Sequence, residues 1–335
     1  MTPRTARPTT PPPLPQTRTH IYGLVVDSEM ELYQDRPAPD DQPTDVVITV
    51  GEPTAQGDDI AGGRLLLDSL GAVEDDKRYF AVERQDGDQI LRFDGACDVE
   101  VSADLARMNV RRAVGAAPGM DSVLTSGAAL SYQLYRRGHL LLHASGVEVD
   151  GRAWAFTGNA GWGKTSVAAL LCGEGGELIT DDVLRVDLDG EQPVARLGAT
   201  ELRLRSGSAG FVDRFDVGGP GVRSSADHRE VLQLSDHAAD RLPVAAVVIP
   251  QLDRHSVTPI AEALPPRAAV LTLLRFPRLL GWRDPNVLQQ QFAGLSELVR
   301  RVPVVVVRIP WRQPFADDIG MSTLRAVESA AARVR

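Results

Sequence analysis

After residue 20 the chain alternates between short apolar runs and turn residues, a pattern typical of β-strands. The dipeptide Asp86-Gly87 separates two of these runs and predicts a tight hairpin. Residues 1–19 are mostly Pro, Thr and Arg with almost no apolar side chains, and this composition predicts a disordered tail. We therefore expect a β-rich unit over residues 20–115, built on the runs IYGLVV, TDVVITV, RLLLDS, RYFAVERQ and QILRFDG.

The rest of the chain, residues 116–335, mixes helical spacing with strand-like runs. A helix is expected over 119–137, where apolar residues recur at helical spacing until Gly138 ends it. Two runs on either side of Asp150-Gly151, LLLHASGVEV and RAWAFTG, predict a second hairpin. This alternation predicts an α/β layer architecture. Further helices are expected at 165–172, 268–280 and 285–301, and further strands at ELIT, VLRVDL, PVARLG, ELRLR, 243–250 and 302–310.

Composition narrows the classes of function. With 36 basic residues, 45 acidic residues and a net charge of −9, the chain lacks the positive field that binds nucleic acid or an anionic membrane surface. Hydrophobic residues make up 43% of the chain, enough to build a core, while two cysteines cannot form a disulfide scaffold. No apolar run is long enough for a membrane-spanning helix. We expect a cytoplasmic protein with neither nucleic acid nor membrane as a partner.

The segment GNAGWGKTS at residues 158–166 carries the sharpest motif in the chain, and it fits G-x-x-x-x-G-K-[ST] at every fixed position. Glycines let successive backbone N–H groups turn inward around a polyphosphate, and the helix that follows adds the positive end of its dipole. In this pattern Lys164, one of only two lysines in the chain, reaches the β- and γ-phosphates, and the Thr165 hydroxyl ligates Mg²⁺. The predicted nucleotide-binding residues are Gly158, Asn159, Ala160, Gly161, Trp162, Gly163, Lys164, Thr165 and Ser166.

Three further residues extend this site. Asp181 and Asp182 end the strand ELIT, at the edge of the sheet where the glycine-rich segment also lies. One carboxylate could hold Mg²⁺ while the other accepts a proton from an attacking hydroxyl, although a solvated turn explains the same residues. His143 lies on the first strand of the hairpin and could contact the acid pair or the γ-phosphate; a strand histidine with an ordinary hydrogen bond is the alternative.

His143, the segment GNAGWGKTS and the strand end LITDD together resemble the HPr kinase/phosphorylase group of P-loop kinases. The match is closest to the HPr-kinase-like proteins of biosynthetic clusters, including lasso-peptide serine kinases. It covers residues 140–190 and extends more loosely to the C-terminus. The stretch ELRLRSG departs from the family's E-[IV]-R-G signature, so phosphorylase activity and oligomeric state do not carry over, and self-association stays open.

The resemblance implies a P-loop kinase core of the HPr kinase and phosphoenolpyruvate carboxykinase type, with ATP and Mg²⁺ as cofactors. It implies that Asp181 is the catalytic base, that Asp182 supports the metal or its orientation, and that His143 assists at the acid pair. Lys164 would hold phosphates beside the loop amides. A further metal contact falls loosely at Glu201, and Arg203 or Arg205 would steady phosphate charge or lie on the surface.

Three functions fit these residues. The leading hypothesis is a Mg-ATP-dependent kinase that phosphorylates a serine-like hydroxyl of a peptide, a protein or a small molecule. A second is a switch protein that slowly hydrolyses nucleotide; the chain has no N/T-K-x-D guanine motif, which disfavours GTP. A third is a non-catalytic ATP-binding component of a biosynthetic complex. The β-rich unit could recognise a partner, brace the core or mediate self-association.

Overall fold

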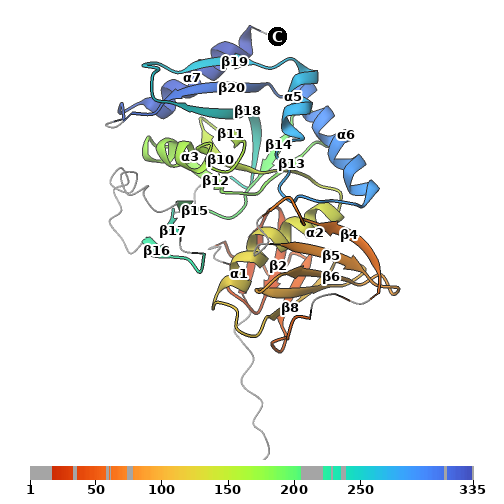
Figure 1. The fold of residues 1–335 in the computed structure, drawn as a ribbon. Coiled ribbons are helices and arrows are strands. Elements are labelled where there is room, and N and C mark those ends of the chain that lie inside the picture. Colours follow the sequence, from red (N-terminus) through yellow and green to blue (C-terminus); the bar gives the residue numbers. More distant parts are fainter. Residues whose placement is uncertain are drawn as a thin grey trace, which may run out of the picture.

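A computed structural model describes residues 17–32, 36–57, 60, 62–73, 78–204, 222–227, 229–234, 239–312 and 315–333. The chain forms a mixed α/β structure with two large sheets (Figure 1). The first sheet lies in the lower lobe of Figure 1 and the second in the upper lobe, with helix α2 near their junction. Within the described residues, no helix is both long enough and apolar enough to cross a bilayer.

The first sheet has eight strands in the order β1-β2-β3-β8-β7-β6-β5-β4. Neighbours pair antiparallel except β2 with β3 and β3 with β8. The hairpin predicted at Asp86-Gly87 is confirmed, because this turn joins β5 to β6. The strands are β1 (Thr17–Ile21), β2 (Leu24–Ser28), β3 (Val46–Val50), β4 (Arg64–Asp68), β5 (Tyr79–Glu83), β6 (Gln89–Phe93), β7 (Cys97–Val101) and β8 (Arg107–Arg112).

The first strand corrects one expectation about the N-terminal tail. Strand β1 starts at Thr17, inside the segment 1–19 that composition predicts to be disordered, because Thr17–Ile21 pairs with Leu24–Ser28 across a two-residue turn. Pairing with β2 and burial of the apolar end of β1 favour a strand here, although the first residues of β1 are polar. The rest of the predicted tail, residues 1–16, lies outside the described residues.

A helix covers the segment that the sequence predicts as helical at 119–137, and it changes its winding midway. Helix α1 (Met120–Leu124) continues through a π-helical turn, η2 (Thr125–Ala129), into α2 (Leu130–Arg136). The prediction of a helix is confirmed, and the π-helical turn is an addition that periodicity did not indicate. Tyr132 and Tyr135 of α2 are fully buried in one core with strands of the first sheet. This helix is therefore packed on the β-rich unit.

The second sheet has nine strands, and its centre feeds the glycine-rich segment. Strands β10 and β11 form the predicted hairpin around Asp150-Gly151, and β11, β18 and β20 run parallel. The strands are β9 (Leu140–Leu142), β10 (Ala144–Val149), β11 (Arg152–Thr157), β12 (Glu177–Thr180), β13 (Leu184–Asp187), β14 (Val194–Arg196), β18 (Arg241–Asp253), β19 (Ile260–Ala263) and β20 (Val304–Pro310). A small third sheet contains β15 (Glu201–Leu204), β17 (Glu230–Gln233) and β16 (Val222–Ser224), in that order.

Helices pack into two apolar clusters that share this second sheet. Helices α3 (Lys164–Gly173) and α7 (Ile319–Ala332) belong to one cluster, and α5 (Pro266–Leu273) and α6 (Pro285–Arg301) to the other. Helix α6 matches its predicted span because Asp284 caps it by accepting a hydrogen bond from the Asn286 N–H at 3.0 Å. The expected helix at 268–280 is wrong in length, since α5 ends at Leu273.

Candidate functional site

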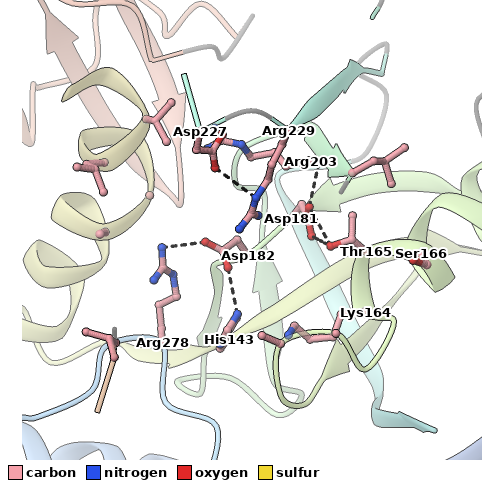
Figure 2. A pocket seen from close by; sticks show the side chains of 18 of the residues that line it. His143, Lys164, Thr165, Ser166, Asp181, Asp182, Arg203, Asp227, Arg229 and Arg278 are labelled. Carbon is pink, nitrogen blue, oxygen red and sulfur yellow. Dashed lines mark hydrogen bonds and ion pairs between the residues drawn. The ribbon is translucent and has the colours of Figure 1, made fainter. Parts of the chain in front are cut away.

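A cavity of about 1310 Å³ is lined by residues of both lobes. Figure 2 shows part of its lining, with the glycine-rich segment on one side and a helix on the other. Residues of both lobes contribute to it, including the loop at 160–166, the acid pair, Arg203, Arg278, helix α1 and the ends of β5 and β6. Most of the predicted site residues therefore border the same space as the β-rich unit.

The segment of residues 158–165, called the glycine-rich loop below, links β11 to α3 and includes the first two residues of that helix. Gly163 has a φ of 91°, a conformation that side chains rarely adopt, and a Cβ there would lie 2.9 Å from the Leu252 methyl groups. Lys164 is buried, and its Nζ donates to the backbone oxygens of Gly158 at 2.9 Å and Asn159 at 3.3 Å. The loop thus presents its curved backbone and the start of α3 to the cavity.

The predicted nucleotide-binding residues separate into two groups. Gly158 and Asn159 offer carbonyl oxygens to Lys164, and Trp162 turns away from the cavity to pack edge-on against Phe276, with ring centroids 5.4 Å apart. Trp162 therefore stabilises the loop from behind, a role that the sequence did not indicate. The residues of the loop region that line the cavity are Ala160, Gly161, Gly163, Lys164, Thr165 and Ser166.

Asp181 sits deep beside the start of α3. Its carboxylate accepts hydrogen bonds from the Ser145 hydroxyl at 2.6 Å, from the Thr165 hydroxyl at 2.9 Å and from the Arg203 backbone N–H at 3.1 Å. Burial raises the pKa of this carboxyl, and the Ser145 hydrogen bond only partly offsets it. Asp181 is therefore joined to the same threonine that the motif predicts as a magnesium ligand.

Asp182 faces the other way, toward the open cavity. Its Oδ1 lies 3.1 Å from His143 Nε2 and its Oδ2 lies 2.8 Å from an Arg278 Nη, and 41% of the side chain is exposed (Figure 2). Burial acts to raise its pKa, but the Arg278 charge and the His143 contact outweigh it and hold the pKa of Asp182 well below its usual range. Asp182 has a φ of 109°, an uncommon conformation for a residue other than glycine.

His143 lies where one predicted strand divides into two. His143 lies between β9 and β10 and interrupts the predicted strand. On one side of it β9 pairs with β13, and on the other side β10 pairs with β11 and β12. The Thr157 hydroxyl donates to the His143 carbonyl oxygen at 2.9 Å, which ties this break to the end of β11. The histidine ring is thereby held beside Asp182.

Arg278 is the site residue that sequence reasoning missed. It follows α5 in a segment that the sequence predicts as helix, and no motif surrounds it. Arg203 also lines the cavity and pairs with Asp227 at 3.0 Å, and Arg229 pairs with the same carboxylate at 3.2 Å. Arg205 lies outside the described residues.

The structure sets Glu201 apart from the other predicted metal ligands. Its Oε1 pairs with Arg223 at 2.6 Å, and burial raises the pKa of its carboxyl. Glu201 is not among the described residues that line the cavity. We therefore leave it out of the magnesium ligands proposed below.

Comparisons with known proteins give little guidance. No protein-family model matches the chain, and no curated protein matches it. Among solved structures, the chain is similar to the Hpr(Ser) kinase/phosphatase from Coxiella burnetii, with a TM-score of 0.31 and 12% identity over 58% of this chain and 97% of that one. At that TM-score the likeness supports no conclusion about family or activity, so both have to come from the residues of the site.

Proposed function

We propose that this protein is a kinase that transfers the γ-phosphoryl group of Mg-ATP to a hydroxyl of a peptide, a protein or a small molecule. One observation carries the proposal: adjacent carboxylates border one cavity, one bonded to Thr165 of the glycine-rich loop and the other open to the cavity beside His143. In protein kinases one aspartate holds the metal and another accepts the proton of the substrate hydroxyl, and the two carboxylates here could divide the same roles.

The phosphate donor would lie along the glycine-rich loop. Backbone N–H groups of the loop and of the first turn of α3 suit an anionic triphosphate, as does Lys164 once its ammonium moves from the loop carbonyls to the phosphates. Arg203 and Arg229 add positive charge on the same wall. The loop, Lys164 and these arginines would therefore neutralise the charge of the donor.

The residues fit a magnesium ion. Mg²⁺ is usually held by one or two protein oxygens together with phosphates and waters, and Thr165 and Asp181 place a hydroxyl and a carboxylate side by side. When bound, Mg²⁺ neutralises charge on the β- and γ-oxygens.

The base that receives the acceptor's proton is Asp182 in this proposal, whereas the resemblance implied Asp181. Asp181 already accepts hydrogen bonds from two hydroxyls and one amide, while the carboxylate of Asp182 is open to the cavity. The acceptor oxygen forms a bond to the γ-phosphorus, the bond from that phosphorus to the β–γ bridging oxygen breaks, and ADP leaves. The proton of the acceptor hydroxyl passes to Asp182, which His143 and Arg278 hold in position.

The nucleoside end of the donor would lie at the ends of β18 and β20. These strands run parallel to β11, so their carboxyl ends reach the same sheet edge as the glycine-rich loop. Trp311 and Phe315 line the cavity there with ring centroids 4.8 Å apart, and exposed Arg254 lies beside them in the lining. Aromatic rings of this kind suit stacking with a nucleobase.

Label transfer from γ-labelled ATP to a pool of serine peptides tests the proposal. Asp182→Asn should lower transfer by roughly 100-fold or more while ATP still binds, since the variant loses the proton acceptor but keeps the loop. Asp181→Asn should instead raise the Mg²⁺ concentration needed for half-maximal rate. Exposed Asp41→Asn is the matched control and should behave as the unmodified protein.

Three results would contradict parts of this proposal. Unchanged transfer by Asp182→Asn would contradict the assignment of Asp182 as the base but not the kinase function. Release of free phosphate without label in any peptide would favour a nucleotide-hydrolysing switch. ATP binding without either product would favour a non-catalytic component of a complex.

A further inference from the structure

The cavity continues past Asp182 into a space bordered by the β-rich unit. Its walls are the first turns of the helix that begins at Met120 and the ends of strands β5 and β6. We call this region the apolar arm; it is lined by Tyr79, Phe93, Met120, Val123, Leu124 and Leu279. Of these, Met120, Val123 and Leu124 on α1 are only partly buried, so apolar surface faces the cavity.

The position of Asp182 decides which ligand the apolar arm would take. In Figure 2, Arg278 and Asp182 stand between the glycine-rich loop and the yellow helix, which has the colour of residues 120–136 in Figure 1. Lys164 and Thr165 lie on the far side of this pair from the helix. In-line transfer requires the attacking hydroxyl to approach from the side opposite the leaving diphosphate. A hydroxyl that reaches Asp182 therefore belongs to a molecule in the apolar arm.

The volume of the cavity agrees with two ligands. A pocket for one small ligand measures about 300–1,000 Å³, whereas this cavity measures about 1310 Å³. The end that carries the glycine-rich loop also carries the described arginines Arg203 and Arg229, which suit phosphates. In the apolar arm the described charged side chains, Arg78 and Asp94, lie 3.9 Å apart as a weak ion pair, and Arg78 also contacts Asp68 at 3.1 Å.

The π-helical turn links this arm to the acid pair. A Cβ at Gly127 would lie 3.2 Å from an Arg278 Nη, so the helix comes against Arg278 closely at the one position that has no side chain. Arg278 in turn contacts Asp182. Single π-turns inside α-helices are rare and occur frequently at functional sites. A ligand that shifts this helix would therefore shift the groups that hold the acceptor-side carboxylate.

We propose that the apolar arm binds the phosphate acceptor, and that the acceptor carries apolar groups next to its hydroxyl. This inference rests on the kinase function proposed above and adds the chemistry of its second substrate. The β-rich unit and α1 then serve as the acceptor-recognition wall, with Val123 and Leu124 contacting the groups that flank the hydroxyl.

Two matched peptides test the inference, acetyl-Leu-Ser-Leu-amide and acetyl-Gln-Ser-Gln-amide. Each peptide is used at a concentration well below saturation and is incubated with γ-labelled ATP and Mg²⁺. The leucine peptide should be phosphorylated about tenfold faster or more, because burial of a few methylene groups is worth about that factor in specificity. Val123→Asp should lower transfer to the leucine peptide by about tenfold and remove most of the preference. Val257→Asp, on a surface loop where Val257 is 89% exposed, should keep the full preference.

The outcomes separate the two proposals. Met120→Gln serves as a second variant of the apolar arm, because it conserves the shape of the side chain. The ATP affinity of every sample is measured by calorimetry. Equal rates for the two peptides, an unaltered preference in both arm variants, or no labelling of either peptide by a protein that does label the pool of serine peptides would each overturn the inference. Failure of the protein to bind ATP would instead overturn the kinase function itself.

Discussion

Asp181 and Asp182 follow each other in the chain but meet opposite environments. Burial raises the pKa of Asp181 although its hydrogen bonds partly offset the effect, while Arg278 and His143 keep the pKa of Asp182 low. The unusual φ of Asp182 is strained, and such strain persists only where the surroundings hold it. The strained residue is the one whose carboxylate faces the cavity, so the local conformation agrees with a role in positioning a reacting group.

The contact of Arg278 with Asp182 leads to a prediction for a single side chain. Arg278→Met should lower phosphoryl transfer by about 100-fold, because a carboxylate that loses its ion-pair partner moves from its position. Arg278→Lys keeps the charge and should recover part of the rate. Initial rates at saturating ATP measure this effect. The ATP affinity of the variant, measured by calorimetry, should stay within a few-fold of that of the unmodified protein. A normal rate in Arg278→Met would show that Asp182 needs no such partner.

His139 gives a pH dependence of stability. Burial, with Arg185 nearby, lowers the pKa of His139 from 6.5 to about 4. The folded protein therefore keeps this histidine neutral while the unfolded chain takes up a proton below pH 6.5, so its stabilising contribution is present above that pH and is lost as pH falls toward 4. His139→Gln should remove this part of the acid sensitivity. Urea unfolding midpoints between pH 7 and pH 4 test it; parallel curves for both proteins would contradict it.

At the scale of elements, the segment after α5 lies against the first sheet and approaches its backbone very closely at one glycine. Gly281 has a φ of 85°, and a Cβ there would lie 1.9 Å from the Asp68 carbonyl oxygen, while the Asp68 N–H donates to the Gly281 oxygen at 3.0 Å. Arg278 lies three residues earlier, so this contact also sets the position of a site residue.

Gly281→Ala should therefore destabilise the protein by about 3 kcal/mol or more, since the added methyl group meets backbone that cannot move aside. Gly175→Ala is the matched control: its φ is 97° but nothing lies within 4 Å of its Cβ position, so it should cost only about 1 kcal/mol. Denaturant unfolding of both variants gives the comparison. Equal costs would mean that the close approach to Asp68 is unimportant.

Elements that depend on local signals could be predicted from the sequence. Both Asp-Gly hairpins, the helix after the glycine-rich loop and helix α6 follow from turn residues, caps and periodicity. The π-helical turn was not expected, because no local pattern marks it. Helix α7 was also not predicted, although its buried residues Thr323, Val327 and Ala330 recur at helical spacing. The surroundings of the acid pair could not be predicted either. Which carboxylate meets Thr165 and which meets Arg278 depends on contacts between segments far apart in the chain.

The largest apolar cluster of the molecule crosses the expected boundary between its two units. It joins strands of the first sheet to helix α2, and also includes Val183, Leu279 and Val287 from the second half of the chain. Arg136 of α2 adds a polar link, because it contacts the buried carboxylate of Asp284 and, at 3.4 Å, that of Glu83. Contacts of this kind couple the stability of the two lobes.

This coupling leads to a prediction for the whole molecule. A nucleotide that binds only the folded state stabilises it by about 2.7 kcal/mol at 100 times its Kd, and in a cooperative unit that gain reaches every amide that exchanges by global unfolding. Mg-ATP should therefore slow hydrogen exchange in β6 of the first sheet as well as in β11, although the two strands belong to different sheets. Lys164→Ala, which removes the phosphate-binding ammonium, supplies the control and should show neither change. Slower exchange in β11 with β6 unchanged would mean that the lobes unfold separately, and the shared core would then not join them into one folding unit.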